Sequence, residues 1–201
     1  LMAAVPGIDV VAAVDTDRKR TAAARKELPG IKTFNSVKKL LDWDEFDVAV
    51  NLLPHNVHAS VTLECLKAGK HGIVEKPFTI TIAEATELIE TAKANDVVLS
   101  VHHNRRWDAD FWTVKGLVDR GTIGEVFNVE MWMGGYGRPN PDWWRSDKVV
   151  SGGAFHDWGA HFIDWLLNVV DKRMISVFGF FHDLVWHDIS IEDHCHAVVR
   201  F

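Results

Sequence analysis

The segment Ser151–Asn168 (SGGAFHDWGAHFIDWLLN) carries residue types suited to acid–base chemistry. Asp157 and His161 are four positions apart, so on a helix they are neighbours one turn apart. A carboxylate there can orient an imidazole that takes up a proton. The two glycines before the helix let a ligand approach the backbone closely. For this helix taken alone, a solvent-facing polar stripe is the favoured alternative.

A second candidate for proton chemistry is Lys76, in the motif Glu75-Lys76-Pro77. It directly follows the apolar run Gly72–Glu75, where buried neighbours would suit a lysine to proton chemistry. The proline after it disfavours helical geometry at Lys76. A surface ion pair is an equally weighted alternative.

Two further strand ends indicate dinucleotide contacts. Asp15 follows the apolar run Asp9–Val14, and an acid at such a strand end accepts hydrogen bonds from an adenosine ribose. The glycine-rich fingerprint precedes such an acid by about 20 residues, which lies before Leu1, so we expect a truncated chain. Asn51–His58 (NLLPHNVH) opens a helix whose free N–H groups suit an anion or a carboxamide. For Asp15 taken by itself, an aspartate that only starts a turn is the favoured alternative. For Asn51–His58 the alternative is an ordinary loop between a strand and a helix.

Strand and helix signals alternate through the first half of the chain. Short apolar runs predict strands buried on both faces, and single helices between them predict parallel pairing. Strands are expected at Asp9–Val14, Asp47–Leu52, Gly72–Glu75 and Asp96–His102, with helices at Arg18–Leu28, Asn56–Lys70 and from the Thr81–Glu84 capping box to about Ala94. The expected fold class is α/β, a Rossmann-like doubly wound parallel sheet without its first strand.

The composition changes near residue 104 and becomes aromatic, Gly-rich and His-rich. Glu125–Met133 alternates apolar and polar residues, which predicts a strand with one buried face. Helices are expected at Asp108–Arg120 and Gly153–Asn168, a long loop at Gly134–Ser151, and strands at Met174–His182 and Cys195–Phe201. These predict part of an α+β domain with an open, largely antiparallel sheet. The expected domains are 1–104, which binds nucleotide, and 105–201, for substrate and oligomerisation, each incomplete at its outer end.

Composition and charge exclude several classes of protein. The 201 residues include 22 basic and 28 acidic side chains, a net charge of −6, and 47% are hydrophobic. This supports a packed core and argues against nucleic-acid binding. No apolar run approaches the roughly 18 residues of a membrane span. Two cysteines without a CxxC motif indicate a cytoplasmic location, and the C-terminal histidines lack zinc-site spacing, so no metal site is expected.

Together these motifs resemble the Gfo/Idh/MocA oxidoreductases, a family named for glucose–fructose oxidoreductase and inositol dehydrogenase. The order is Asp15 after a strand, then LPHNVH, EKP before a capped helix, HNRRW and SGGAFHDWGAH. EKP followed after about 75 residues by GG-x-x-x-D-x-G-x-H is the specific part. The resemblance covers essentially the whole chain and implies a nucleotide-binding domain followed by a domain with a large open sheet.

The resemblance also implies roles for individual residues. Lys76, Asp157 and His161 match catalytic positions, and Asp15 matches the acid that binds ribose. Trp144 is included among the expected substrate contacts because aromatic faces stack on sugar rings, although packing in the core would explain a tryptophan there equally well. The other cofactor contacts implied are Leu52, Leu53, Pro54, His58, Glu75, Lys76 and Arg105, and the substrate contacts are Arg106, Trp144, Asp157 and His161.

The expected function is hydride transfer between NAD, or NADP, and a sugar, an inositol or a related polyol. His161 takes the hydroxyl proton, Lys76 donates to the developing alkoxide, and Asp157 tunes His161 or binds a neighbouring hydroxyl. Asp15 favours NAD because a carboxylate repels a 2′-phosphate, although the basic run Arg18–Arg20 follows closely.

A homo-oligomer is expected through the open sheet, whose second face carries Trp132, Phe178 and Phe180. Two other classes of function remain open. One is a catalytically silent protein of the same fold that binds a nucleotide or a sugar. The other is a metal-dependent hydrolase that uses the C-terminal histidines.

Overall fold

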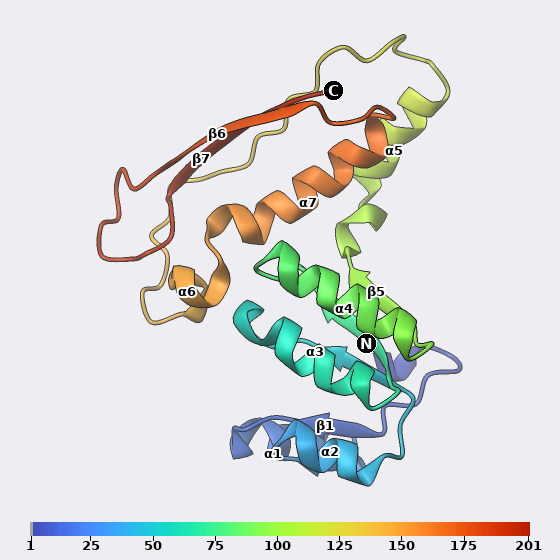
Figure 1. The fold of residues 1–201 in the computed structure, drawn as a ribbon. Coiled ribbons are helices and arrows are strands. Elements are labelled where there is room, and N and C mark those ends of the chain that lie inside the picture. Colours follow the sequence, from blue (N-terminus) through green and yellow to red (C-terminus); the bar gives the residue numbers. More distant parts are fainter. Residues whose placement is uncertain (1) are drawn as a thin grey trace.

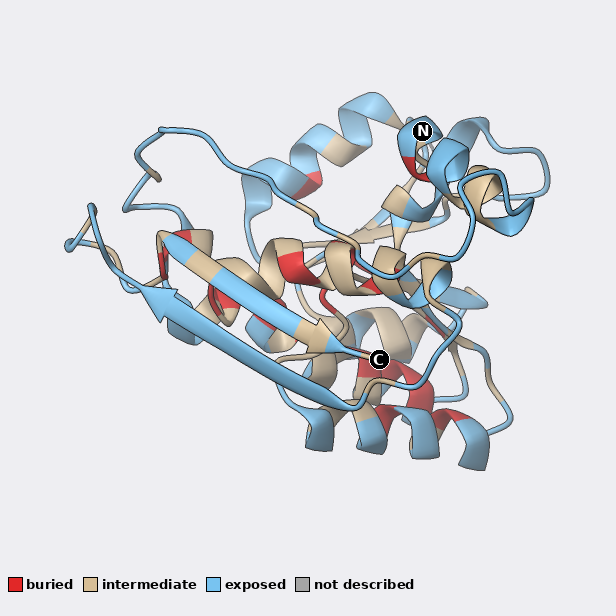
Figure 2. Ribbon diagram, turned by 90° about the horizontal axis from the view of Figure 1, so that it is seen from above, coloured by how far each residue is buried: buried red, intermediate tan, exposed pale blue. Residues whose placement is uncertain are grey.

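The structure of the protein, a computed structural model, describes residues 2–201. In the N-terminal half, helices pack against short parallel strands (Figure 1). In the C-terminal half, an antiparallel hairpin lies over one long helix, and both views place the hairpin against that helix (Figures 1 and 2).

The N-terminal half alternates strands and helices. Its strands are β1 (Ala12–Val14), β2 (Lys32–Phe34), β3 (Val48–Asn51), β4 (His71–Glu75) and β5 (Leu99–His102), and its helices are α1 (Arg18–Glu27), α2 (Val37–Trp43), α3 (His58–Lys67) and α4 (Ile82–Ala94), with short 3-10 turns η1 (Met2–Ala4) and η2 (His55–Val57). β1 pairs with β2, and β3, β4 and β5 pair in that order, all parallel. The predicted Rossmann-type fold is therefore confirmed, with its strands in two parallel sheets.

Strand β2 and helix α2 were not predicted from the sequence. β2 is too short to show a hydrophobic period, and its partner β1 fixes it through the pairs from Ala12–Lys32 to Val14–Phe34. α2 begins after Ser36, whose hydroxyl accepts a hydrogen bond from the Lys39 N–H, as an N-cap should. It ends at Asp44, which adopts a φ of 61°.

The core of the N-terminal half lies between α3 and α4. Leu66 and Leu88 are essentially inaccessible to solvent, and Ala92 completes the buried cluster. The predicted capping box is present, since Thr81 and Glu84 each accept a hydrogen bond from the other's backbone N–H. This capped helix follows Lys76 closely, so it helps to fix the end of β4.

The C-terminal half carries the predicted long helix and hairpin. Its elements are η3 (Asn104–Trp107), α5 (Ala109–Asp119), η4 (Trp144–Ser146), α6 (Lys148–Ser151), α7 (Ala154–Val169), β6 (Ser176–His182) and β7 (His194–Arg200). β6 and β7 pair antiparallel, and Phe181 of β6 packs edge-on against Phe155 of α7. The hairpin's other face is exposed (Figure 2).

The predicted strand Glu125–Met133 is wrong, because this segment forms no strand within residues 2–201. Phe127, expected on its buried face, is 98% exposed. A strand must pair its N–H and C=O groups with a neighbour. In the described part of the chain β6 and β7 pair only with each other, so the alternating segment has no partner.

Candidate active site

Helix α7 turns its polar face inward. Asp157, His161 and Asp164 lie on that face, and the last two are only 4% and 8% exposed. The alternative of a solvent-facing polar stripe is therefore wrong. Buried polar groups need partners, and here the partners of the two carboxylates are Lys76 after β4, Arg106 of η3 and Arg145 of η4.

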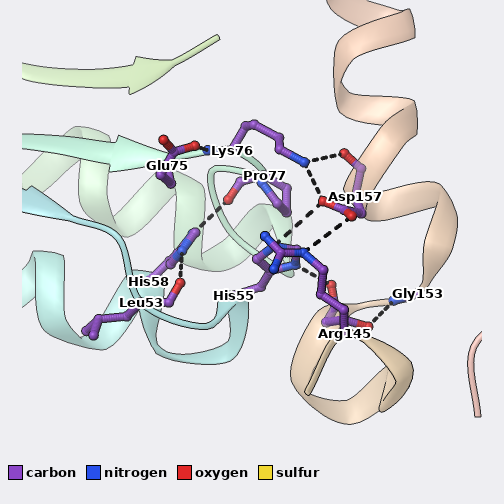
Figure 3. Close-up of polar contacts among 10 residues, drawn as sticks. Leu53, His55, His58, Glu75, Lys76, Pro77, Arg145, Gly153 and Asp157 are labelled. Atoms are coloured by element: carbon purple, nitrogen blue, oxygen red, sulfur yellow. Dashed lines mark hydrogen bonds and ion pairs between the residues drawn. The ribbon is translucent and has the colours of Figure 1, made fainter. Parts of the chain in front are cut away.

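The first of these partners is Lys76, directly after β4. Its ammonium group donates to the main-chain oxygen of Asp157 at 2.8 Å and to carboxylate Oδ1 (Figure 3). Both side chains are mostly buried. The Lys76–Pro77 peptide bond is cis. The structure thus joins the carboxyl end of a parallel strand to the first turn of α7, and it brings together two residues that the sequence singled out.

Two more groups contact the Asp157 carboxylate. Arg145 of η4 places Nε 3.5 Å from Oδ2, and His55 of η2 places Nε2 4.0 Å from Oδ1 (Figure 3). The Arg145 guanidinium lies over the ring of Trp144, which packs edge-on against His55. Trp144, a predicted substrate contact, therefore borders this cluster.

The expected support of His161 by Asp157 is not present. Within residues 2–201 no hydrogen bond joins the two side chains, because the Asp157 carboxylate turns toward Lys76 and Arg145. Burial, together with the neighbouring charges of Lys76 and Arg105, lowers the pKa of His161 to about 4, and Asp157 opposes this shift only weakly. His161 is therefore neutral at pH 7 and able to accept a proton.

His55 is a site residue that the sequence analysis missed. It is 2% exposed, and its Nδ1 donates to the Ser151 carbonyl at 2.7 Å, which fixes Nε2 as the unprotonated nitrogen. Burial lowers the pKa of His55 to about 4. Its Nε2 makes no hydrogen bond within the described residues, so a buried lone pair faces the edge of the Asp157 carboxylate.

His103 is a second residue that was missed. It follows β5, the neighbour of β4, and its Nδ1 is buried without a hydrogen-bond partner in the described chain. Burial lowers the pKa of His103, and the charges that act on it include those of Asp164 and Lys76. Its position after a strand end next to Lys76 was the available signal, within the HNRRW motif.

His58, a predicted cofactor contact, has a structural role. This side chain is fully buried, and its ring nitrogens lie 2.8 Å from the carbonyl oxygens of Pro77 and Leu53 (Figure 3). It ties the loop after β3 to the loop after β4. Both ring nitrogens of His58 are engaged by the main chain, and its contact with a cofactor stays a prediction.

Arg106, a predicted substrate contact, pairs with Asp164, and its side chain is 49% exposed. Its guanidinium binds both carboxylate oxygens of Asp164, at 2.6 to 3.0 Å, which raises the pKa of Arg106. This pair fastens η3 to the buried face of α7. Arg105, by contrast, lies over the Trp158 ring and pairs with Asp108, and its charge reaches His161.

The predicted cofactor contacts follow the carboxyl ends of parallel strands, where ligands bind in open α/β sheets. Asp15 follows β1, and its 25% exposed carboxylate accepts from the Asp17 N–H and pairs with Arg20 at 3.5 Å. The Leu52 side chain after β3 is 66% exposed. Glu75, at the end of β4, contacts His102 Nδ1 at 2.7 Å. Leu53 and Pro54, the other predicted cofactor contacts after β3, are half-buried.

These residues fit a dinucleotide. The accessible carboxylate of Asp15 suits a ribose, and the exposed side chain of Leu52 suits an aromatic ring. The Nδ1 atom of His103, which has no hydrogen-bond partner in the described chain, lies near Lys76. Among residues 2–201, no three His, Cys, Asp or Glu side chains converge to hold a metal ion. No helix in that range is long and apolar enough to cross a membrane.

A parallel sheet with acid–base residues at its carboxyl edge defines a dinucleotide-binding oxidoreductase fold. Residues 1–103 match the family model described as "Oxidoreductase family, NAD-binding Rossmann fold", and residues 111–201 match the "GFO/IDH/MocA C-terminal domain". The chain belongs to the Gfo/Idh/MocA oxidoreductase family, and its N-terminal half is an NAD-binding Rossmann domain.

Relatives agree with this assignment. The chain is 35% identical over 179 residues to the uncharacterized oxidoreductase YdgJ of Escherichia coli, covering 89% of this chain and 49% of that protein. It is 31% identical to the scyllo-inositol 2-dehydrogenase (NADP(+)) IolW of Bacillus subtilis, over 75% of this chain and 42% of that protein. The structure of an NAD-binding protein from Listeria innocua superposes with a TM-score of 0.89 at 31% identity, over 98% of this chain and 57% of that protein. The chain thus spans about half the length of such relatives.

Proposed function

We propose that the protein transfers hydride between NAD and the CHOH carbon of a sugar, an inositol or a related polyol. The observation that carries this proposal is the pairing of Lys76 with Asp157 at the carboxyl edge of the parallel sheet, with the neutral, buried His161 close enough to feel the Lys76 charge. The name of IolW, a dehydrogenase of scyllo-inositol, supports a polyol as the substrate class.

Each protein residue has a separate task in this reaction. Bound NAD supplies the hydride acceptor. His161 accepts the hydroxyl proton, because its lowered pKa keeps the ring neutral at pH 7. Lys76 has three N–H donors, of which the hydrogen bonds to Asp157 use two, so one remains for the developing alkoxide. Asp157 holds Lys76 in place.

We propose that NAD is preferred to NADP. The Asp15 carboxylate accepts bonds from two free ribose hydroxyls and repels a 2′-phosphate. Arg20 lies 3.5 Å from Asp15, and this ion pair holds the cation on the carboxylate. We expect at least a tenfold higher kcat/KM with NAD, about 1.4 kcal/mol, and a smaller ratio for Asp15→Ala. A tenfold preference for NADP, or an unchanged ratio in the variant, would contradict the assignment.

The proposal extends to assembly and location. Phe178 and Phe180 lie on the exposed face of the hairpin, so we propose a homo-oligomer built through that face. Both cysteines, Cys65 and Cys195, are free thiols, which supports the proposal of a cytoplasmic protein.

The direct experiment is a dehydrogenase screen of the purified protein against sugars and inositols, with NAD and with NADP. Reduction of NAD in the presence of one polyol is the expected result. Cofactor binding in calorimetry without turnover of any substrate would favour the catalytically silent alternative. Turnover that requires an added divalent metal ion would favour the hydrolase.

A further inference from the structure

We propose that Arg145 binds a carboxylate group of the substrate, so that an acidic sugar or polyol is preferred to its neutral counterpart. This inference rests on the proposed function, because it concerns the substrate of the same site. It starts from the Asp157 carboxylate, which has Lys76 at Oδ1 and Arg145 at Oδ2 (Figure 3). One carboxylate faces two cations, and one positive charge is left without a counterion.

Neighbouring charges do not cancel this excess. The two other arginines of the region have their own carboxylates, in the pairs Arg105–Asp108 and Arg106–Asp164. Glu75 points away from Asp157, and its oxygens contact His102 Nδ1 and the Lys76 main-chain N–H (Figure 3). The buried imidazoles of His55 and His161 are neutral at pH 7. An excess cation at a partly buried site attracts an anion.

The Arg145 guanidinium is fixed in place, and its hydrogen-bonding capacity is unused. It lies over the rings of Trp143 and Trp144, at 4.7 and 4.3 Å from their centres. Its ion contact with Asp157 is 3.5 Å long, and within residues 2–201 none of its N–H groups makes a hydrogen bond. The side chain is 32% exposed, so a ligand can reach it. A fixed planar guanidinium matches the two oxygens of a carboxylate.

The position of Arg145 suits one end of a small substrate. Arg145 and Lys76 contact the two oxygens of the same carboxylate, so a ligand of monosaccharide size with its CHOH group at Lys76 also reaches Arg145. Trp143, which is 48% exposed, offers an aromatic face on which a sugar ring can stack.

The test compares matched acidic and neutral sugars with the purified protein and NAD. The pairs are glucuronate with glucose and galacturonate with galactose, and glucose 6-phosphate tests another anion. We expect kcat/KM at least tenfold higher for the acids. We expect Arg145→Met to remove this preference, because it should raise KM for the acids at least tenfold more than KM for the neutral sugars. Arg173→Met, at an exposed arginine far along the chain from the cluster, should behave as wild type.

Calorimetric binding of the same sugars separates this inference from the proposed function. Glucuronate binding that Arg145→Met weakens, without turnover, would support the carboxylate site and contradict the proposed hydride transfer. Turnover of neutral sugars without a preference for their acids would overturn the carboxylate site and leave the proposed function standing. A preference for glucose 6-phosphate over glucuronate would also overturn it. Neither binding nor turnover of any sugar would contradict both.

Discussion

Three imidazoles, those of His55, His103 and His161, surround the Lys76–Asp157 pair, and burial lowers the pKa of each. The unperturbed value near 6.5 would leave a histidine partly protonated at neutral pH. A lowered value instead keeps the ring as a proton acceptor beside an ammonium group. The site therefore combines a fixed positive charge with imidazoles that are neutral at pH 7.

The pH dependence of turnover follows from His161. The imidazole must be neutral to accept a proton, so kcat/KM should stay level from pH 7 down to about 5 and fall as the pH drops through about 4. His161→Gln should lower kcat about 100-fold or more and remove that acid limb. Steady-state rates across this pH range provide the measurement. An acid limb near pH 6.5 in the wild type, or an unchanged profile in the variant, would show that another group is the base.

At the scale of elements, the start of α7 sets the position of Asp157. Gly153, the N-cap, has a φ of 108° and no side chain of its own to cap the helix. Glu192, from the loop before β7, supplies the cap by accepting the Phe155 N–H at 3.0 Å. The carboxylate is buried, and the hydrogen bond from Phe155 and the charge of Lys148 hold the pKa of Glu192 below its usual range, although burial opposes them.

This arrangement predicts the effect of a methyl group at Gly153. A Cβ atom there would lie 2.7 Å from both Glu192 carboxylate oxygens, and the backbone conformation suits only glycine. Gly153→Ala should therefore lower the free energy of unfolding by about 3 kcal/mol or more. Gly121→Ala is a matched control, since Gly121 also has a positive φ but has open space around it. Urea denaturation that gives equal losses for the two variants would contradict the role of Glu192.

Local sequence patterns predicted the long elements well and the contacts between them poorly. Helix α7 and the hairpin strands have clear periods, and the structure confirms them. The alternation in Glu125–Met133 is equally clear, but alternation does not supply a pairing partner. In the site, the meeting of Lys76 and Asp157 was implied by the family resemblance, which matched both residues to catalytic positions. The contacts of His55 and Arg145 with Asp157 were not, because they depend on how distant loops pack.

At the scale of the whole molecule, one sheet face has no cover within the described residues. Phe178, Phe180 and Val198 share the outer face of the hairpin and are 63%, 45% and 52% exposed, while Phe181 on the inner face contacts Phe155 of α7 and is 52% exposed. An apolar face of this kind marks an interface in soluble proteins. The same face carries His182, His194 and His196.

Sedimentation of the purified protein at micromolar concentration tests the proposed homo-oligomer. We expect a dimer or larger species, and we expect Phe180→Glu to shift it toward the monomer because a buried charge destabilises an interface. Trp132→Glu is an informative comparison, since Trp132 is 86% exposed but lies outside the hairpin. A wild-type protein that sediments only as a monomer would refute assembly through this face.

The most direct test of the proposed reaction is the rate of NADH formation by Lys76→Met with the substrate found in the screen. The methionine keeps the length of the side chain but has no donor for the alkoxide and no charge for Asp157. We predict that kcat falls about 1000-fold while the circular dichroism spectrum is unchanged. Lys172→Met, at an exposed surface lysine paired with Glu125, serves as the control. A Lys76→Met protein whose kcat stays within about twofold of the wild type would contradict the catalytic role of this site.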